Sequence, residues 1–165
     1  MPPSIDIDAT LAYLADELRP HLKRNPIMIG VHSGGAWIAT RLHRALALPD
    51  PLGTLDISFY RDDFTRVGVN PTVKTSNLPV NIEDRHVILV DDVLHTGRTV
   101  RAALNEIFDY GRPASVLLAV LICRDGRELP IQADLVGHSI QLNPNEHIKL
   151  LGPEPLALKV QEVGG

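Results

Sequence analysis

The stretch of sequence that decides the fold is Val87-Ile88-Leu89-Val90-Asp91-Asp92-Val93-Leu94-His95-Thr96-Gly97-Arg98-Thr99. Four apolar residues lead into two neighbouring carboxylates, and a Thr-Gly-Arg-Thr turn then leads into a helix. A buried strand that ends in this way delivers its last side chains to the carboxyl end of a sheet. Asp91 and Asp92 are therefore expected where ligands bind in open α/β sheets.

The turn after the two acids indicates what kind of ligand this is. Backbone N–H groups at a helix start suit a phosphate group. The carboxylates of Asp91 and Asp92 repel a phosphate, but they suit hydroxyl groups or a cation that takes oxygen ligands. A phosphorylated ribose with Mg²⁺ satisfies both halves of the stretch. The alternative is a buried strand followed by two solvated acids and an ordinary helix start. The phosphate loop of nucleoside triphosphatases is excluded, because G-x-x-x-x-G-K-[ST] does not occur.

The flanking segments predict a sheet covered by helices. Apolar residues recur at strand spacing and at helical spacing in alternating segments. The expected elements are a helix over about 8–24, a strand over 27–31, a helix after the tight turn His32–Gly35, a half-exposed strand over 55–60, a strand over 87–90, a helix from Thr99 with Phe108 on its apolar face, and a strand over 116–122. This order favours an α/β fold with a mostly parallel sheet and helices on both faces.

The remaining segments are less regular. Residues 61–80 carry many polar residues without clear periodicity, and a loop of this length is usually functional or disordered. Two short strands are expected near 134–140 and 147–151, and the tail from Gly152 is expected to be loosely ordered. A length of 165 residues fits one domain over residues 1–165.

The bulk composition narrows the classes of function. The chain is 44% hydrophobic and 22% charged, as globular proteins are. No run of about 20 apolar residues predicts a membrane segment. The single cysteine, Cys123, and an N-terminus without a signal-peptide pattern favour the cytoplasm. A net charge of −4 is not typical of a protein with a large nucleic-acid footprint.

Residues 87–99 resemble the signature for phosphoribosyl diphosphate (PRPP) in the type I phosphoribosyltransferases. All positions of the stretch fit that pattern: an apolar strand, two acids, two apolar residues, a variable residue and Thr-Gly-Arg-Thr. The resemblance implies that Asp91 and Asp92 lie on the ribose hydroxyls and, directly or indirectly, on Mg²⁺. It implies a 5′-phosphate loop made of Thr96, Gly97, Arg98 and Thr99. It implies a pyrophosphate loop made of His32, Ser33, Gly34 and Gly35.

Two further segments, Asp56–Asp63 and Arg124–Ile131, resemble the branch of this family that regulates pyrimidine operons and has uracil phosphoribosyltransferase activity. The resemblance implies that uracil and PRPP give UMP and pyrophosphate with Mg²⁺, in a homodimer or larger assembly. It implies a small hood formed by the termini and about 124–151, and a mobile lid over about 61–80. The residues it implies are Cys123, Arg124, Leu135 and Val136 around the base and Arg61, Arg66 and Lys74 on the lid.

The role of His95 stays open between two interpretations. It lies between the acids and the phosphate turn, where a catalytic residue could accept a proton from uracil. The alternative is a loop histidine that faces solvent. The lid cations have a similar pair of interpretations, as ligands of pyrophosphate oxygens or as solvated loop charges.

Two departures from the family pattern bear on an alternative function, and the first favours it whereas the second, an unfavourable charge balance for RNA, opposes it. The predicted pyrophosphate loop has no Lys or Arg, which should weaken pyrophosphate binding. The N-terminal helix carries Asp8, Asp16 and Glu17 among its basic residues, although binding of an mRNA leader depends on phosphate contacts to Lys or Arg. The alternative is an RNA-binding transcription attenuator that senses UMP or UTP and has weak or no transferase activity. A third interpretation is another base, such as guanine or orotate.

Overall fold

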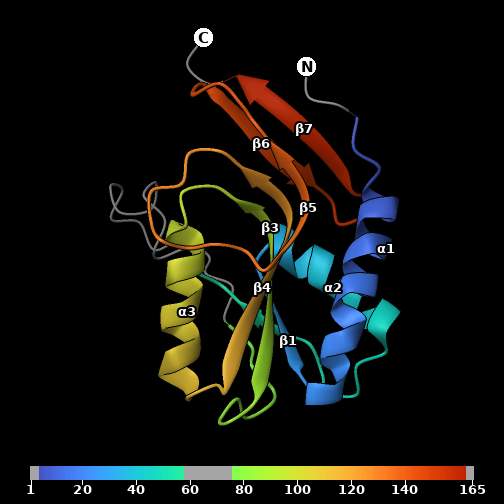
Figure 1. Ribbon diagram of the computed structural model, residues 1–165, viewed down its shortest axis with the longest axis vertical. Helices are drawn as coiled ribbons and strands as arrows, with labels where there is room; N and C mark the ends of the chain where they lie inside the picture. Colours follow the sequence, from blue (N-terminus) through green and yellow to red (C-terminus); the bar gives the residue numbers. More distant parts are fainter. Residues whose placement is uncertain (1–3, 58–75, 163–165) are drawn as a thin grey trace.

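The computed structural model describes residues 4–57 and 76–162, and it shows one central sheet between two layers of helices (Figure 1). The sheet has the strand order β2-β1-β3-β4-β5, and every neighbouring pair in it is parallel. Its strands are β1 (Ile27–Val31), β2 (Gly53–Leu55), β3 (His86–Leu94), β4 (Ser115–Arg124) and β5 (Leu135–Ile140).

The helices cover both faces of this sheet. Helix α1 (Ile7–Leu18), its 3-10 extension η1 (Arg19–Arg24) and helix α2 (Gly34–Leu46) belong to one side, and helix α3 (Arg98–Tyr110) lies on the other (Figure 1). The predicted α/β fold, with a parallel sheet and helices on both faces, is confirmed. Strands β6 (Glu146–Leu151) and β7 (Ala157–Glu162) form a separate antiparallel pair.

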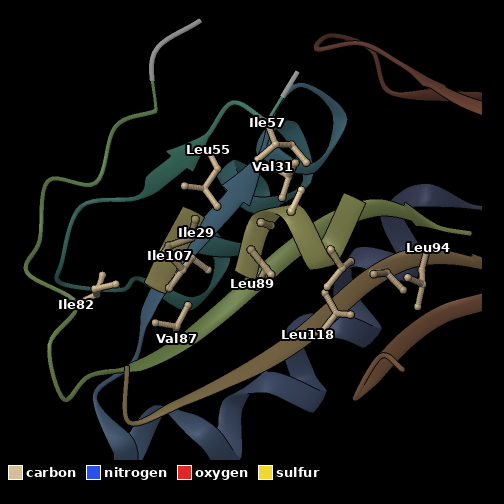
Figure 2. Packing of buried hydrophobic residues seen from close by; sticks show 14 of the residues in the cluster. Ile29, Val31, Leu55, Ile57, Ile82, Val87, Leu89, Leu94, Ile107 and Leu118 are labelled. Atoms are coloured by element: carbon tan, nitrogen blue, oxygen red, sulfur yellow. The ribbon is translucent and has the colours of Figure 1, made fainter. Parts of the chain in front are cut away.

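Strand β3 divides the core between the two helical layers. Val87 and Leu89 join the cluster that contains Ile107 of α3, as Figure 2 shows. Ile88 and Val90 join the cluster built on α1 and α2. Successive side chains of a strand point to opposite faces, so a run of four apolar residues is buried on both sides. Each such side chain contributes roughly 1.5–3 kcal/mol when it is fully removed from water.

Strand β3 runs past its expected end at residue 90 and includes both acids. Its partner β4 continues to Arg124, so that Asp91 pairs with Val120 and Leu94 pairs with Cys123. Asp91 and Asp92 therefore lie within the ladder of the central strand and do not follow it. This placement holds their backbone in the hydrogen-bonded ladder of β3 and β4.

Several expected boundaries and exposures were wrong. The first α-helix ends at Leu18, because Pro20 has no N–H to continue the helical hydrogen bonds. The expected strand over 55–60 overlaps β2 (Gly53–Leu55) only at Leu55; residues 56 and 57 are not in a strand, and residues 58–60 lie outside the described residues. The side chain of Phe108 is 56% exposed and does not join the buried face of α3.

The tail expected to be loose from Gly152 instead forms β7, which pairs with β6 from Glu146↔Glu162 to Leu151↔Ala157. The inward face of this hairpin packs against the hydrophobic cluster that contains residues of α1 and α2, through residues such as Ile148, Leu150 and Leu158.

In the part of the chain that the structure describes, no helix is long and apolar enough to cross a membrane.

Candidate active site

The two acids of β3 differ in their surroundings. The side chain of Asp91 is buried, at 3% exposure, whereas that of Asp92 is half-buried. The Oδ1 atom of Asp91 accepts a hydrogen bond of 2.8 Å from the backbone N–H of Asp92. The Oδ1 atom of Asp92 accepts one of 2.8 Å from the N–H of Val93. Both carboxylates are thus oriented by their own strand.

The start of α2 lies directly against these acids. A Cβ atom on Gly35 would come within 2.7 Å of the Val90 carbonyl oxygen and 2.9 Å of the Asp91 Cα atom. A Cβ atom on Gly34 would overlap with the Asp92 carboxylate. Only glycine permits this approach of helix and strand, and it brings the predicted pyrophosphate loop, His32–Gly35, beside both acids.

The turn that precedes α3 has the geometry of an anion site. Gly97 caps the helix with a φ of 99°, a left-handed conformation that favours glycine. The Thr96 Oγ1 atom accepts a hydrogen bond of 3.1 Å from the Arg98 N–H. The first-turn amides of Thr99 and Val100 have no partner within the helix, and the helix dipole favours negative charge there. Thr96–Thr99 thus offers N–H and hydroxyl groups in one turn.

His95 lies beneath the loop that follows β4. Its Nε2 atom is 2.9 Å from the position that a Cβ atom on Gly126 would take. Burial lowers the pKa of His95 below its ordinary value of 6.5, and the positive charges of Arg124 and His147 lower it further. The carboxylates of Glu128 and Asp125 act in the opposite direction and are weaker. The imidazole is therefore neutral at pH 7 and able to accept a proton.

The residues expected around the base lie at two levels of the sheet. Cys123 and Arg124 end β4, at the level of Ser139 and Ile140 on β5. Leu135 and Val136 pair with Ala119 and Val120, four residues earlier on β4. Four residues of strand span about 13 Å. Leu135 packs against the cluster of α1 and α2, while Val136 packs against that of α3. The structure thus separates this pair from Cys123 and Arg124.

Arg124 is a buried cation, with 7% of the residue exposed. Its Nη1 atom donates a hydrogen bond of 2.7 Å to the carbonyl oxygen of Glu146, where β6 begins. Its Nε atom donates one of 3.3 Å to the Asp125 carbonyl oxygen. The guanidinium therefore fastens the β6–β7 hairpin to the end of β4 and places a positive charge close to His95.

The lid residues Arg61, Arg66 and Lys74 lie outside the described residues. The chain on either side of them is fixed at neighbouring points. The N–H of Asp56 donates to Ser76 Oγ at 2.9 Å, and Ser76 Oγ donates to Glu106 Oε1 of α3 at 3.0 Å. Thr54 and Asn77 exchange two backbone hydrogen bonds of 2.8 Å. Residues 76–80 are thus attached to the sheet and α3.

Among residues 4–57 and 76–162, no cluster of three or more His, Cys, Asp or Glu side chains is arranged to hold a metal ion. Asp91 and Asp92 supply hard oxygen donors beside an anion-binding turn. Mg²⁺ is commonly bound by one or two carboxylates together with substrate phosphates. The donor set therefore fits Mg²⁺ shared with a phosphate-bearing ligand, and it does not fit a metal held by the protein alone.

Comparisons with known proteins agree with this geometry. The family described as the phosphoribosyl transferase domain matches residues 6–151. The chain belongs to the phosphoribosyltransferase family. Its resemblance to the pyrimidine operon regulators is confirmed by curated relatives named bifunctional protein PyrR. One from Nitrosococcus oceani is 58% identical and covers 98% of this chain and 95% of the relative. One from Pseudomonas aeruginosa PAO1 is 54% identical and covers 90% of each.

Solved phosphoribosyltransferases share the fold. A hypoxanthine-guanine-xanthine phosphoribosyltransferase is 25% identical with a TM-score of 0.63, and the match covers 86% of this chain and 80% of that one. A purine phosphoribosyltransferase from Pyrococcus horikoshii has the same identity and score, with 82% and 83% covered. The predicted phosphoribosyltransferase fold is confirmed.

Sequence reasoning about this phosphoribosyltransferase missed one group next to the predicted site. The Glu128 carboxylate lies 2.7 Å from Nη2 of Arg98. Glu128 belongs to the Arg124–Ile131 segment, whose sequence indicated only the branch of the family. The signal was a single acid in a loop, 30 residues away from its partner.

Proposed function

We propose that the protein transfers the phosphoribosyl group of PRPP to uracil, giving UMP and pyrophosphate, and that it also regulates the expression of pyrimidine-biosynthesis genes. The observation that carries the transferase is the placement of Asp91 and Asp92 against the helix start at Gly34–Gly35 and just before the helix start at Gly97. One start would receive the pyrophosphate and the other the 5′-phosphate, with the ribose hydroxyls on the acids between them. The family and the relatives named bifunctional support both parts.

The reaction breaks the bond between ribose C1 and pyrophosphate oxygen and forms a bond from C1 to a uracil nitrogen. Positive charge builds on the ribose as the old bond breaks. The carboxylates of Asp91 and Asp92 favour that charge, because they are fixed beforehand by the β3 backbone. Mg²⁺, when bound with PRPP, would neutralise charge on the departing pyrophosphate. Arg61, Arg66 and Lys74 are proposed to close on the same oxygens, which would also exclude water.

His95 is proposed to accept the proton that uracil loses. It lies at the end of β3, three residues beyond Asp92, and its lowered pKa keeps a lone pair available at neutral pH. Cys123, which pairs with Leu94, and Arg124, whose charge acts on His95, are proposed to read the polar edge of the base through main-chain groups. Leu135 and Val136 are proposed to pack near the base from their level on β5, opposite Ala119 and Val120.

The second candidate function is a UMP- or UTP-sensing attenuator that binds an mRNA leader. The predicted pyrophosphate loop favours it, because His32, Ser33, Gly34 and Gly35 supply no fixed positive charge. A protein with this loop would still hold a nucleoside monophosphate, whose phosphate uses the turn at Thr96–Thr99. The two functions share one nucleotide site and differ in turnover.

We also propose that the protein is a cytoplasmic homodimer or larger assembly, as the family resemblance implies. Phe108 and Tyr110 on α3 and Tyr13 on α1 are large apolar side chains that are about half exposed. Light scattering at micromolar concentration should give at least twice the mass of one chain. A mass of 18.1 kDa would contradict the assembly.

The transferase is tested by incubating the protein with PRPP, Mg²⁺ and one base at a time. Uracil should yield UMP and pyrophosphate, while guanine, hypoxanthine and orotate should yield no nucleotide. A nucleotide from guanine or orotate instead of uracil would contradict the choice of base. If no base reacts and calorimetry still detects UMP binding, the sensor replaces the transferase as the function of this site.

A further inference from the structure

The turn at Thr96–Thr99 is fastened to the loop that follows β4. The Thr96 carbonyl oxygen accepts hydrogen bonds from the N–H groups of Glu128, at 3.0 Å, and Leu129, at 2.9 Å. A Cβ atom on Gly97 would come within 3.1 Å of Ile131 and 3.2 Å of Leu129, which is tight contact. We call Asp125–Ile131 the clamp loop. Backbone bonds and side-chain packing both hold it against this turn.

Arg98 adds an ion pair to these contacts. Its Nη2 atom lies 2.7 Å from Glu128 Oε1, and the two side chains are 50% and 55% exposed. The guanidinium of Arg98, which the sequence assigned to the phosphate, is therefore engaged by a carboxylate of the clamp loop. If Arg98 turned towards a phosphate dianion, Glu128 would be left as an unpaired negative charge close to that dianion, which is unfavourable.

The other end of the clamp loop reaches the region proposed for the base. Gly126 lies against His95. Asp125 Oδ1 accepts a hydrogen bond of 3.0 Å from the N–H of Leu142, beyond β5. The loop therefore contacts both the turn at Thr96 and His95 within seven residues, Asp125–Ile131.

We propose that Arg98 and Glu128 are positioning residues whose ion pair holds the clamp loop on the 5′-phosphate loop, and that the Arg98 side chain does not bind the phosphate. The proposal rests on the proposed function, since it assumes a nucleotide phosphate at Thr96–Thr99. The phosphate is bound by first-turn amides and threonine hydroxyls. The ion pair sets the position of those groups relative to the base.

The competing role of Arg98, as a direct ligand of the phosphate, makes different predictions. A charged hydrogen bond to a phosphate is worth about 1.5–3 kcal/mol, so its loss would weaken UMP binding about 10- to 150-fold. Removing the Glu128 charge would then tighten UMP binding, because a repelling carboxylate is gone. A positioning pair instead makes both removals weaken binding by a similar, smaller factor.

The test is a double-variant cycle on UMP affinity, measured by calorimetry. Arg98→Ala and Glu128→Ala should each weaken UMP binding about three- to fivefold, as expected for an exposed ion pair. The double variant should be no weaker than either single one. Glu128→Gln, which keeps an oxygen for Arg98, should restore affinity to within about twofold of the unchanged protein. With PRPP as substrate, KM should rise by the same factor and kcat should not change.

The exposed pair Arg19–Asp16 on α1, at 3.2 Å, supplies the matched control. Arg19→Ala and Asp16→Ala should leave UMP affinity unchanged. A large loss in Arg98→Ala together with tighter binding in Glu128→Ala or Glu128→Gln would overturn the positioning role and leave the proposed function intact. Failure of the unchanged protein to bind UMP would overturn the proposed function and this inference with it.

Discussion

The carboxylate of Asp92 lies against the Cα atom of Gly34, in the space that a Cβ atom on Gly34 would fill. Gly34, the first residue of α2, and Asp92, the second acid of β3, are thus direct neighbours in the structure, although they lie 58 positions apart in the sequence. This contact joins the predicted pyrophosphate loop to the predicted ribose site. The contact requires glycine at position 34, because any side chain there would meet the Asp92 carboxylate.

Gly34→Ala should inactivate the protein without unfolding it. The added methyl group must displace the Asp92 side chain, which can rotate, whereas a methyl on Gly35 meets the backbone of Val90 and Asp91. A misplacement of about 1 Å at a reacting group costs roughly 100-fold in rate, so kcat/KM for UMP formation should fall by about that factor. The melting temperature should change little.

Two variants control for this prediction. Thr40→Ala, at an exposed position of the same helix, should leave the rate unchanged. Gly35→Ala should lower the free energy of unfolding by about 1–3 kcal/mol, as overpacking does. A Gly34→Ala protein with normal turnover would show that Asp92 and the start of α2 do not act together.

The pH dependence of turnover should reflect His95. Its pKa is lowered from 6.5, chiefly by burial. The neutral form that accepts a proton is therefore present at pH 7 and is lost as the pH falls below 6.5. The rate should be flat near neutrality and decline only at more acidic pH. In His95→Ala this acid decline should disappear, and kcat should drop about 100-fold or more if His95 is the base. Unchanged turnover in that variant would show that His95 is a loop histidine without a catalytic role.

Replacing Arg124 should move the pKa of His95 upward. Arg124→Met removes a positive charge that lowers this pKa. His147, which also lowers it, and Glu128 and Asp125, which raise it, remain in place. The change is measured by NMR titration of the His95 ring, which does not depend on activity. The variant should also lose about 1–3 kcal/mol of stability, since the Glu146 carbonyl loses its donor.

Arg19→Met, on the exposed surface of α1, is the matched control and should leave the titration of His95 unchanged. If Arg124→Met also leaves the His95 pKa in place, burial alone accounts for its low value.

Chelation should separate activity from stability. EDTA should abolish UMP formation, because it removes the Mg²⁺ that is expected to bind with PRPP. It should leave the melting temperature unchanged, because no metal cluster occurs among residues 4–57 and 76–162. Added Mg²⁺ should restore the rate, and UMP binding should persist without metal, since Mg²⁺ is expected to be held with PRPP phosphates. A fall in melting temperature on chelation would indicate a structural metal instead.

Much of the fold followed from local sequence pattern. The run Val87–Val90 is apolar on both faces, and this alone places it in the middle of a covered parallel sheet. The strand β7 was missed because Pro153 and Pro155 precede it and because its apolar–polar alternation covers only four residues, Leu158–Gln161. Its pairing with β6 depends on packing against α1 and α2, which no local pattern encodes.

In the candidate site too, contacts within one short motif could be predicted from the sequence, whereas contacts between distant segments could not. Asp91, Asp92 and the turn at Thr96–Thr99 are close in sequence, so a single motif predicts their proximity. The contacts Gly34–Asp92 and Arg98–Glu128 join segments far apart in the chain and depend on how α2 and the clamp loop pack. Arg98 illustrates the limit of the motif, which identifies the residue and not the direction of its side chain.

The most direct test compares UMP formation from uracil and PRPP in the unchanged protein and in Asp91→Asn/Asp92→Asn. Asparagine keeps the oxygens that accept the N–H groups of residues 92 and 93, so the fold should be retained. Removing both charges should lower turnover by at least about 100-fold, because the developing charge on ribose loses its stabilisation. Equal turnover in the two proteins would contradict the assignment of the acids of β3 to this reaction.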